Sequence, residues 1–172
     1  MSAMLGVAVQ AISAALLLIA GAQKLAAPSR FEETLRALGL PLVRSLVVAV
    51  PLVELLTASL ILVRLSPQIA AALTVILGGS FGGAGLVALL QRKTVQCACF
   101  GPIGKGTLGI RQVAAVPLWL TAAAATLYLP GVSGATGVTV LVVLALSAGI
   151  VAAAYLLIKL RSSSSVEEAY SG

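Results

Sequence analysis

The stretch SLVVAVPLVELLTASLILV at residues 45–63 carries a single charged side chain, Glu54. A bilayer core about 30 Å thick needs about 20 apolar residues of α-helix, so this stretch predicts a membrane-spanning helix. The whole chain supports that class of protein, because 60% of its 172 residues are apolar, 9% are charged and none is histidine. A soluble domain is about 25% charged, and an ordinary water-soluble enzyme is therefore excluded.

Other uncharged stretches predict further spanning helices. Residues 112–158 contain no charge and are too long for one crossing, but the turn-rich run LPGVSGATG at 129–137 divides them. We therefore expect an all-α fold, a polytopic membrane helix bundle. Residues 1–161 form its single transmembrane domain and residues 162–172 a short disordered tail. The five expected helices lie at about 4–22, 42–63, 69–90, 112–129 and 138–159.

The 11 basic and 5 acidic residues give a net charge of +6, and their placement indicates topology rather than nucleic-acid binding. With five spans, one side of the membrane receives ten lysines and arginines and the other receives only Arg64. Positively charged loops stay in the cytoplasm, so we expect the N-terminus outside and the C-terminus inside. An odd number of helices accounts for the placement of these charges, so we expect the first helix to be retained in the mature protein. Ala20-Gly21-Ala22 nevertheless resembles the cleavage site of a signal peptide.

The segment between the first two helices has a helical pattern of its own. Ser29 and Glu32 have the spacing of a capping box, and Gly39 stands where a C-cap glycine belongs. Apolar residues recur at helical spacing at Phe31, Leu35 and Leu38. The pattern predicts a short amphipathic helix, which either lies at the membrane surface or is an ordinary helical connector.

The two cysteines, Cys97 and Cys99, stand together in the sequence RKTVQCACFGPIGKG at 92–106. One intervening residue keeps the two sulfurs close, so they can form a small-ring disulfide. A ring this tight is strained, and strained disulfides are easily reduced. We predict that this pair is catalytic in thiol–disulfide exchange.

Basic side chains surround the cysteine pair at Arg92, Lys93, Lys105 and Arg111. Positive charge lowers the pKa of a nearby thiol and raises the fraction of reactive thiolate, so these residues are expected to support the pair. Two other interpretations remain open: the cysteines are small buried hydrophobes, or they bind a soft metal such as Cu(I) or Hg(II). A zinc site within one chain is excluded, because two thiolates without histidine do not complete a tetrahedral ligand set.

Glu54 lies ten residues from both Arg44 and Arg64, about 15 Å from either end of its helix at ~1.5 Å per residue. An ionisable side chain at that depth costs about 2.5–3.5 kcal/mol or more unless it is paired, hydrated or protonated, so it should face the bundle interior. Lys24, at the end of the first helix, is a candidate partner whose long stem can reach into the bundle. The two residues are predicted to relay protons or charge, or else simply to tie helices together.

The run ILGGSFGGAG at 76–85 places glycines four residues apart, at Gly78/Gly82 and at Gly79/Gly83. This spacing is typical of membrane helices that approach closely, so we interpret both pairs as packing surfaces. A second interpretation is that they leave room for a flat cofactor such as a quinone. That possible quinone is the only cofactor that the sequence suggests.

Three segments, taken in order, resemble the methylamine utilisation protein MauE family, within the DoxX-like group of small membrane proteins. They are GAQKLAAPSRFEETLRALGLP at 21–41, PLVELL at 51–56 and CACFG at 97–101. The resemblance extends from about Leu16 to Trp119 and depends on the ordered set Lys24, Pro41, Glu54 and Cys-x-Cys-Phe-Gly. It implies a four-helix core, to which this chain adds one helix.

One position departs from the family pattern. The pattern near the fourth helix is a basic residue followed by asparagine, whereas this chain has Arg111-Gln112. The amide group is kept although the residue is different, so Gln112 is a supporting candidate whose role the resemblance leaves open.

The resemblance implies a protein of the bacterial inner membrane that assists the maturation of a disulfide-rich client. In the family that client is methylamine dehydrogenase, and a thioredoxin-like protein is the partner. This chain then performs thiol–disulfide or electron transfer, with a client that need not belong to methylamine metabolism. The alternatives are a carrier of a soft metal or small thiol ligand, and a non-catalytic subunit that assembles, with itself or with a partner, through its glycine-rich third helix.

The predicted orientation conflicts with the implied client. It places CACFG on the cytoplasmic side, whereas disulfides persist outside the cytoplasm. A loop that folds back into the bundle or moves, or a quinone that carries the electrons, would resolve the conflict.

Overall fold

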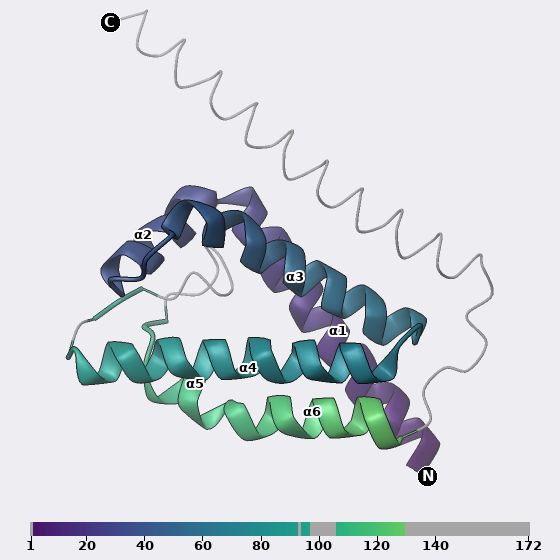
Figure 1. The fold of residues 1–172 in the computed structure, drawn as a ribbon. Helices are drawn as coiled ribbons and strands as arrows, with labels where there is room; N and C mark the ends of the chain where they lie inside the picture. Colours follow the sequence, from purple (N-terminus) through teal and green to yellow (C-terminus); the bar gives the residue numbers. More distant parts are fainter. Residues whose placement is uncertain (1, 93, 97–105, 130–172) are drawn as a thin grey trace, which may run out of the picture.

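The computed structural model describes residues 2–92, 94–96 and 106–129, and within them every regular element is a helix apart from one isolated β-bridge. The helices are α1 (Ser2–Ala26), α2 (Pro28–Ala37), α3 (Val43–Val63), α4 (Pro67–Leu90), α5 (Ile110–Ala114) and α6 (Val116–Tyr128) (Figure 1).

Four stretches of this described chain are long and apolar enough to cross a membrane. They are Met4–Ala26, Val43–Val63, Pro67–Leu90 and Ile110–Tyr128. These stretches confirm the predicted all-α, polytopic membrane bundle and its first four spans. The helix predicted at 138–159 and the tail predicted at 162–172 lie outside the described residues, and the single domain over 1–161 stays a prediction.

The fourth span begins earlier than the predicted residue 112 and is divided into α5 and α6, with Ala115 between them. Pro117 accounts for the division. A proline has no N–H to donate to the carbonyl four residues back, here that of Val113, and its ring disfavours a helix interior. The first turn of a new helix accommodates proline without this loss, and Pro117 lies in the first turn of α6.

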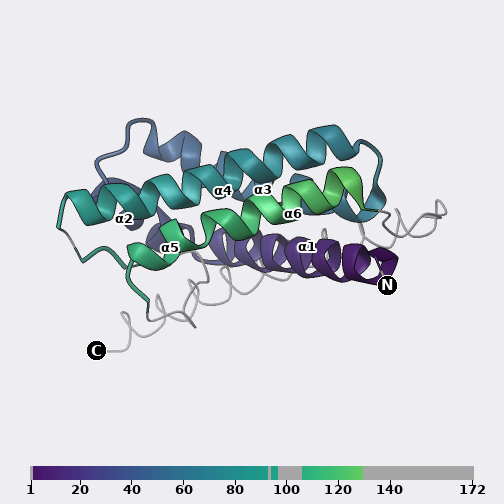
Figure 2. The ribbon, with the colours of Figure 1, turned by 90° about the horizontal axis from the view of Figure 1, so that it is seen from below.

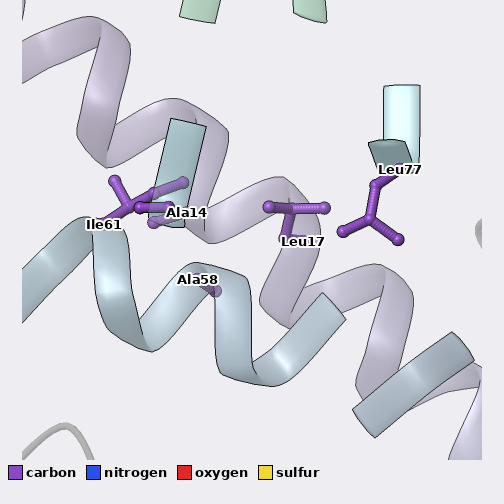
Figure 3. Packing of buried hydrophobic residues seen from close by; sticks show 6 residues of the cluster. Ala14, Leu17, Ala58, Ile61 and Leu77 are labelled. Atoms are coloured by element: carbon purple, nitrogen blue, oxygen red, sulfur yellow. The ribbon is translucent and has the colours of Figure 1, made fainter. Parts of the chain in front are cut away.

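The centre of the bundle is a cluster of small and branched apolar side chains. Ala14 and Leu17 of α1 meet Ala58 and Ile61 of α3, and Leu77 of α4 lies beside them (Figure 3). All five are at most 4% exposed. Because two of the five are alanines, the helix backbones approach closely, which is how helices associate in a membrane where lipid offers no hydrophobic gain.

The helices α4 and α6 lie side by side in both ribbon views (Figures 1 and 2), and two glycines of α4 make this approach possible. A Cβ atom added at Gly78 would lie 2.4 Å from the Cβ of Trp119, and one added at Gly82 would lie 2.3 Å from Cγ2 of Val116. The packing interpretation of this glycine pair is therefore confirmed. The contact is made within the chain, so these two glycines are not a surface for another subunit.

The other predicted glycine pair, Gly79 and Gly83, meets no described neighbour. A Cβ atom added at either residue meets nothing within 4 Å in the described chain, and both glycines are exposed. The pair lies on a face of α4 that α6 does not cover, so its packing interpretation stays a prediction.

The helix α2 begins upstream of the predicted capping box. Its N-cap residue is Ala27, Pro28 lies in its first turn, and no side chain caps it. The predicted cap at Ser29 is therefore wrong. Proline has the helical φ already fixed and is favoured at the first helical position, which moves the helix start to Pro28.

The predicted end of α2 is confirmed. Gly39 has a φ of 71°, in the left-handed region that glycine enters without steric cost. Its N–H donates to the carbonyl of Arg36 at 2.9 Å, and the N–H of Leu40 donates to the carbonyl of Leu35 at 3.2 Å. These two hydrogen bonds form a Schellman motif, which turns the chain toward α3.

Polar side chains close the opposite end of the bundle. Gln10 Nε2 donates to the carbonyls of Ala125 at 3.1 Å and Leu129 at 3.4 Å, and the Arg64 guanidinium donates to the Leu129 carbonyl at 3.0 Å. The last carbonyls of a helix have no partner within it, and a carbonyl left without a partner is costly in lipid. Gln10 and Arg64 therefore fix α1 and α3 to the end of α6.

We predict that Gly78→Ala destabilises the bundle by about 1–3 kcal/mol relative to Gly79→Ala, the cost typical of an overpacked contact. The added methyl group at residue 78 overlaps the Cβ of Trp119, which moves only with the α6 backbone, whereas at residue 79 it meets open space. Denaturation of each purified variant with SDS, followed by circular dichroism, measures the difference. Equal unfolding midpoints would contradict the close contact between α4 and α6.

Candidate functional site

A buried ion pair links α1 to α3. Lys24 Nζ lies 2.6 Å from Glu54 Oε1, and the two side chains are 1% and 0% exposed. The contact between these two predicted residues is thereby confirmed, whereas their role in moving protons or charge stays a prediction. A pair taken out of water loses hydration worth several kcal/mol per ion, and only close contact compensates for it.

A close approach of the two helices brings the charged groups together. A Cβ atom added at Gly21 would lie 3.1 Å from both Leu55 Cγ and the Pro51 carbonyl oxygen, so this site on α1 fits little more than a hydrogen. Lys24 is three residues after Gly21 and on the same helix face, and Glu54 stands between the two α3 residues that Gly21 approaches. The absent side chain at residue 21 therefore sets the separation at which the charges meet.

Two aromatic rings flank the ammonium group. Lys24 Nζ lies 5.5 Å from the centroid of Phe31 on α2 and 5.4 Å from that of Phe81 on α4. A cation within about 6 Å of an aromatic face gains about 0.5–2 kcal/mol from each ring. Phe81 in turn packs against Trp119 of α6, with ring centroids 5.9 Å apart. Four helices thus contribute a side chain to this cluster of one cation and three rings.

Some hydrogen-bonding groups at the ion pair have no partner in the described chain. Glu54 Oε2 is buried and has no hydrogen-bond partner there, and the same holds for Oε1 of the neighbouring Gln23. The ammonium of Lys24 has three N–H donors, of which one goes to Glu54 Oε1. Both members of the pair therefore keep hydrogen-bonding capacity that the described residues do not use.

The two ends of the cysteine-containing loop are fixed to each other. Gln96 and Thr107 form an antiparallel bridge, and the N–H of Leu108 donates to the carbonyl of Val95 at 2.8 Å. The Val95 and Leu108 side chains are both buried, in a cluster with Leu38 and Ala88.

The same loop is also fixed to α2. Thr34 Oγ1 is 3.1 Å from the carbonyl oxygens of both Gln96 and Arg30, and its single O–H is shared between these two acceptors. The predicted amphipathic pattern explains the geometry, since Phe31, Thr34 and Leu35 form the buried face of α2. This face packs on protein, so α2 joins the entrance of the loop to the ring that covers Lys24.

Several predicted site residues lie outside this description or away from the ion pair. Cys97, Cys99, Lys93 and Lys105 fall outside the described residues. Arg92 and Arg111 are exposed near the two ends of the loop.

Gln112 has a local structural role. Its Oε1 accepts a hydrogen bond from the N–H of Gly109 at 2.8 Å, which caps the first turn of α5.

The sequence interpretation missed Thr34 as the residue that fixes the loop and both rings as neighbours of Lys24. Phe31 stands in the predicted apolar stripe of the first connecting segment, and Phe81 stands in the glycine-rich run at 76–85. Both patterns mark a buried face, but neither carries a signal for which charge the ring will cover.

These features define a small, polytopic, all-α membrane protein with a buried Lys–Glu pair and a bridge between the two segments that flank the cysteines. A family model described as "Methylamine utilisation protein MauE" matches residues 2–129, and the chain belongs to this family. The family resemblance of the sequence is thus confirmed over a longer stretch than its motifs covered. No curated protein and no solved structure gives a significant match.

We predict that Lys24→Met lowers the free energy of unfolding by about 3–5 kcal/mol, because it leaves the Glu54 carboxylate buried without its partner. Adding Glu54→Leu removes the second charge and should restore much of the loss. Denaturation with SDS, followed by circular dichroism, measures both variants.

The exposed pair on α2 provides the matched control. Arg36 lies 2.6 Å from Glu32, with side chains 65% and 33% exposed, and an exposed pair contributes only about 0–1 kcal/mol. If Lys24→Met costs no more than Arg36→Met, the buried pair does not hold α1 to α3.

Proposed function

We propose that this member of the MauE family is a membrane thiol–disulfide oxidoreductase. Cys97 and Cys99 form its dithiol, a thioredoxin-like protein is its partner, and a protein that acquires disulfides is its client. The family relationship supports a membrane accessory protein, and the fixed ends of the loop that contains both cysteines are the observation that carries the chemistry.

The exchange takes place in two steps. One cysteine thiolate attacks a disulfide of the partner, forming a mixed disulfide and releasing one partner sulfur as a thiolate. The other cysteine loses its proton and attacks the mixed disulfide, which releases the second partner sulfur and leaves a Cys97–Cys99 disulfide. The partner gains two electrons and the pair loses two. The same steps in reverse oxidise a reduced client.

The fixed loop favours this exchange over a passive role for the cysteines. The bridge between Gln96 and Thr107, together with the Thr34 hydrogen bond, sets the position at which the chain enters the CACF segment. A loop anchored in this way presents a dithiol to a partner at a lower entropic cost than a free loop does. The exposed Arg92 and Arg111 near its two ends favour the thiolate form of the pair.

Lys24 and Glu54 handle protons or charge in this proposal. A proton passed from Lys24 Nζ to Glu54 Oε1 turns two opposite charges into two neutral groups, so the net charge of the site stays zero. Burial disfavours charged groups and therefore favours this transfer, whereas it penalises a single added charge. The 2.6 Å separation of the two atoms requires no movement of either helix.

The basic residues support an orientation with the N-terminus outside and the cysteine loop in the cytoplasm. Figure 1 places α2, the end of α4 and α5 at one end of the bundle, and the turn that follows Arg64 at the other. Lys24 is one of the ten basic residues that the sequence places on the cytoplasmic side, but its side chain is buried. Without it, nine lysines and arginines lie on that side and one, Arg64, on the other. The bacterial inner membrane fits this orientation, and the dithiol then exchanges electrons on the cytoplasmic side.

We expect wild-type protein in glutathione redox buffers to pass between two free thiols and none, because the second cysteine closes the ring faster than a second glutathione attacks. Alkylation followed by intact-protein mass spectrometry counts the thiols. Cys97→Ser and Cys99→Ser should each accumulate a mixed disulfide with glutathione instead. A wild-type protein that accumulates the glutathione adduct, or that keeps both thiols in oxidising buffer, would overturn the proposal.

Single cysteines placed at the two ends of α4 test the orientation. In a background without Cys97 and Cys99, Gln68→Cys should react with a membrane-impermeant maleimide in intact spheroplasts, and Gln91→Cys only after permeabilisation. Both glutamines are exposed, so access to each depends on which side of the membrane it faces. The reverse labelling pattern would show that the loop faces outward.

A further inference from the structure

A cavity of about 380 Å³ lies beside the ion pair, between α2, α3 and α4. We call it the ion-pair cavity. Its walls are apolar except for a few groups, and the only charged side chain in its lining is Lys24. A volume of about 300–1,000 Å³ with an apolar wall and few polar groups is typical of sites for small molecules.

The inner end of the cavity is polar and aromatic. Lys24, Phe31 and Phe81 all line it, and each ring centroid is within 5.5 Å of Nζ. Glu54 Oε1 is the only acceptor of a Lys24 N–H in the described chain, so the ammonium has donors to spare. This end therefore fits a flat ring that carries a hydrogen-bond acceptor.

The charge balance decides which acceptor fits. Glu54 already neutralises the ammonium at 2.6 Å, so a phosphate or carboxylate would add an uncompensated charge to a buried site, which is costly. A carbonyl oxygen accepts the same hydrogen bond and adds no charge. The ion pair therefore selects a neutral oxygen over an anionic lipid headgroup.

The outer end of the cavity opens between α3 and α4. Leu46 and Val50 of α3 line one side, and Ser80 and Gly83, both exposed on α4, line the other. An opening on this apolar flank of the bundle lets a hydrocarbon tail extend from the cavity into lipid.

We propose that the ion-pair cavity binds a membrane quinone, with a ring carbonyl accepting from Lys24 Nζ and the tail leaving between α3 and α4. This inference rests on the proposed function, to which it adds a second oxidant of the dithiol beside the partner disulfide. Two thiols give up two electrons and two protons, a disulfide forms, and the quinone becomes the quinol. The site itself is formed by residues other than the cysteines, so binding can be tested without them.

The only tryptophan of the chain reports on the site, because Trp119 packs against the cavity-lining Phe81. Decylubiquinone titrated into the purified protein in phosphatidylcholine nanodiscs should quench its fluorescence to saturation, near one quinone per chain. Gly83→Leu fills the opening and should weaken binding at least tenfold. Gly79→Leu is the matched control, since residue 79 is equally open but does not line the cavity, and it should bind as the wild type does.

Three results would overturn the site. The first is quenching that never saturates, which indicates simple partition into lipid. The second is saturation that Gly83→Leu leaves unchanged, which places the quinone elsewhere, as in the apolar groove between α1 and α6 that Trp119 itself lines. The third is full displacement when phosphatidylglycerol replaces phosphatidylcholine, which assigns the cavity to an anionic headgroup.

The cysteines separate this inference from the proposed function. The double variant Cys97→Ser/Cys99→Ser should bind decylubiquinone as the wild type does, and reduced wild type should form one quinol for every two thiols lost. Binding without thiol oxidation would overturn the electron transfer and leave the site standing. Thiol oxidation that is equally fast in Gly83→Leu would overturn the site and leave the dithiol function standing.

Discussion

The buried contact between Lys24 Nζ and Glu54 Oε1 is the constraint on which the described bundle depends. Two ions without water are tolerated only at close range, and their 2.6 Å separation requires the backbones of α1 and α3 to approach closely. Gly21, which fits little more than a hydrogen against α3, meets that requirement. The small side chains Ala14 and Ala58 continue the close packing along the pair of helices.

The ion pair also determines what the other helices must cover. α1 ends two residues after Lys24, so the ammonium would lie at an open helix end if nothing followed. α2 supplies Phe31 and α4 supplies Phe81 as its covering rings. Phe81 also packs on Trp119 of α6, and Gly78 lets Trp119 approach α4 closely. The position of α6 is therefore coupled to the Lys24–Glu54 pair.

Much of this fold is predictable from the sequence because the bilayer leaves few choices. An apolar stretch of about 20 residues must satisfy its own backbone, which only a helix does within one segment, and a buried acid requires a partner. Lys24 was therefore a rational candidate for Glu54. The two glycine pairs of α4 could not be told apart, because Gly78/Gly82 and Gly79/Gly83 have equal spacing and only the position of α6 distinguishes their faces.

The limits on predicting the site follow from the same physics. Which ring faces Lys24 depends on the rotation of α2, and that rotation follows from Pro28 at its start and Gly39 at its end. With the helix so placed, Thr34 reaches the Gln96 carbonyl while Phe31, one turn earlier, covers the ammonium. A sequence interpretation that starts the helix at a Ser29 cap does not include this coupling. α2 thus contacts both the entrance of the cysteine loop and the buried charge, and α4 does so as well, through Ala88 and Phe81. Thr34 and Phe31 lie on the same buried face of α2, so one helix face serves both the loop entrance and the ion pair.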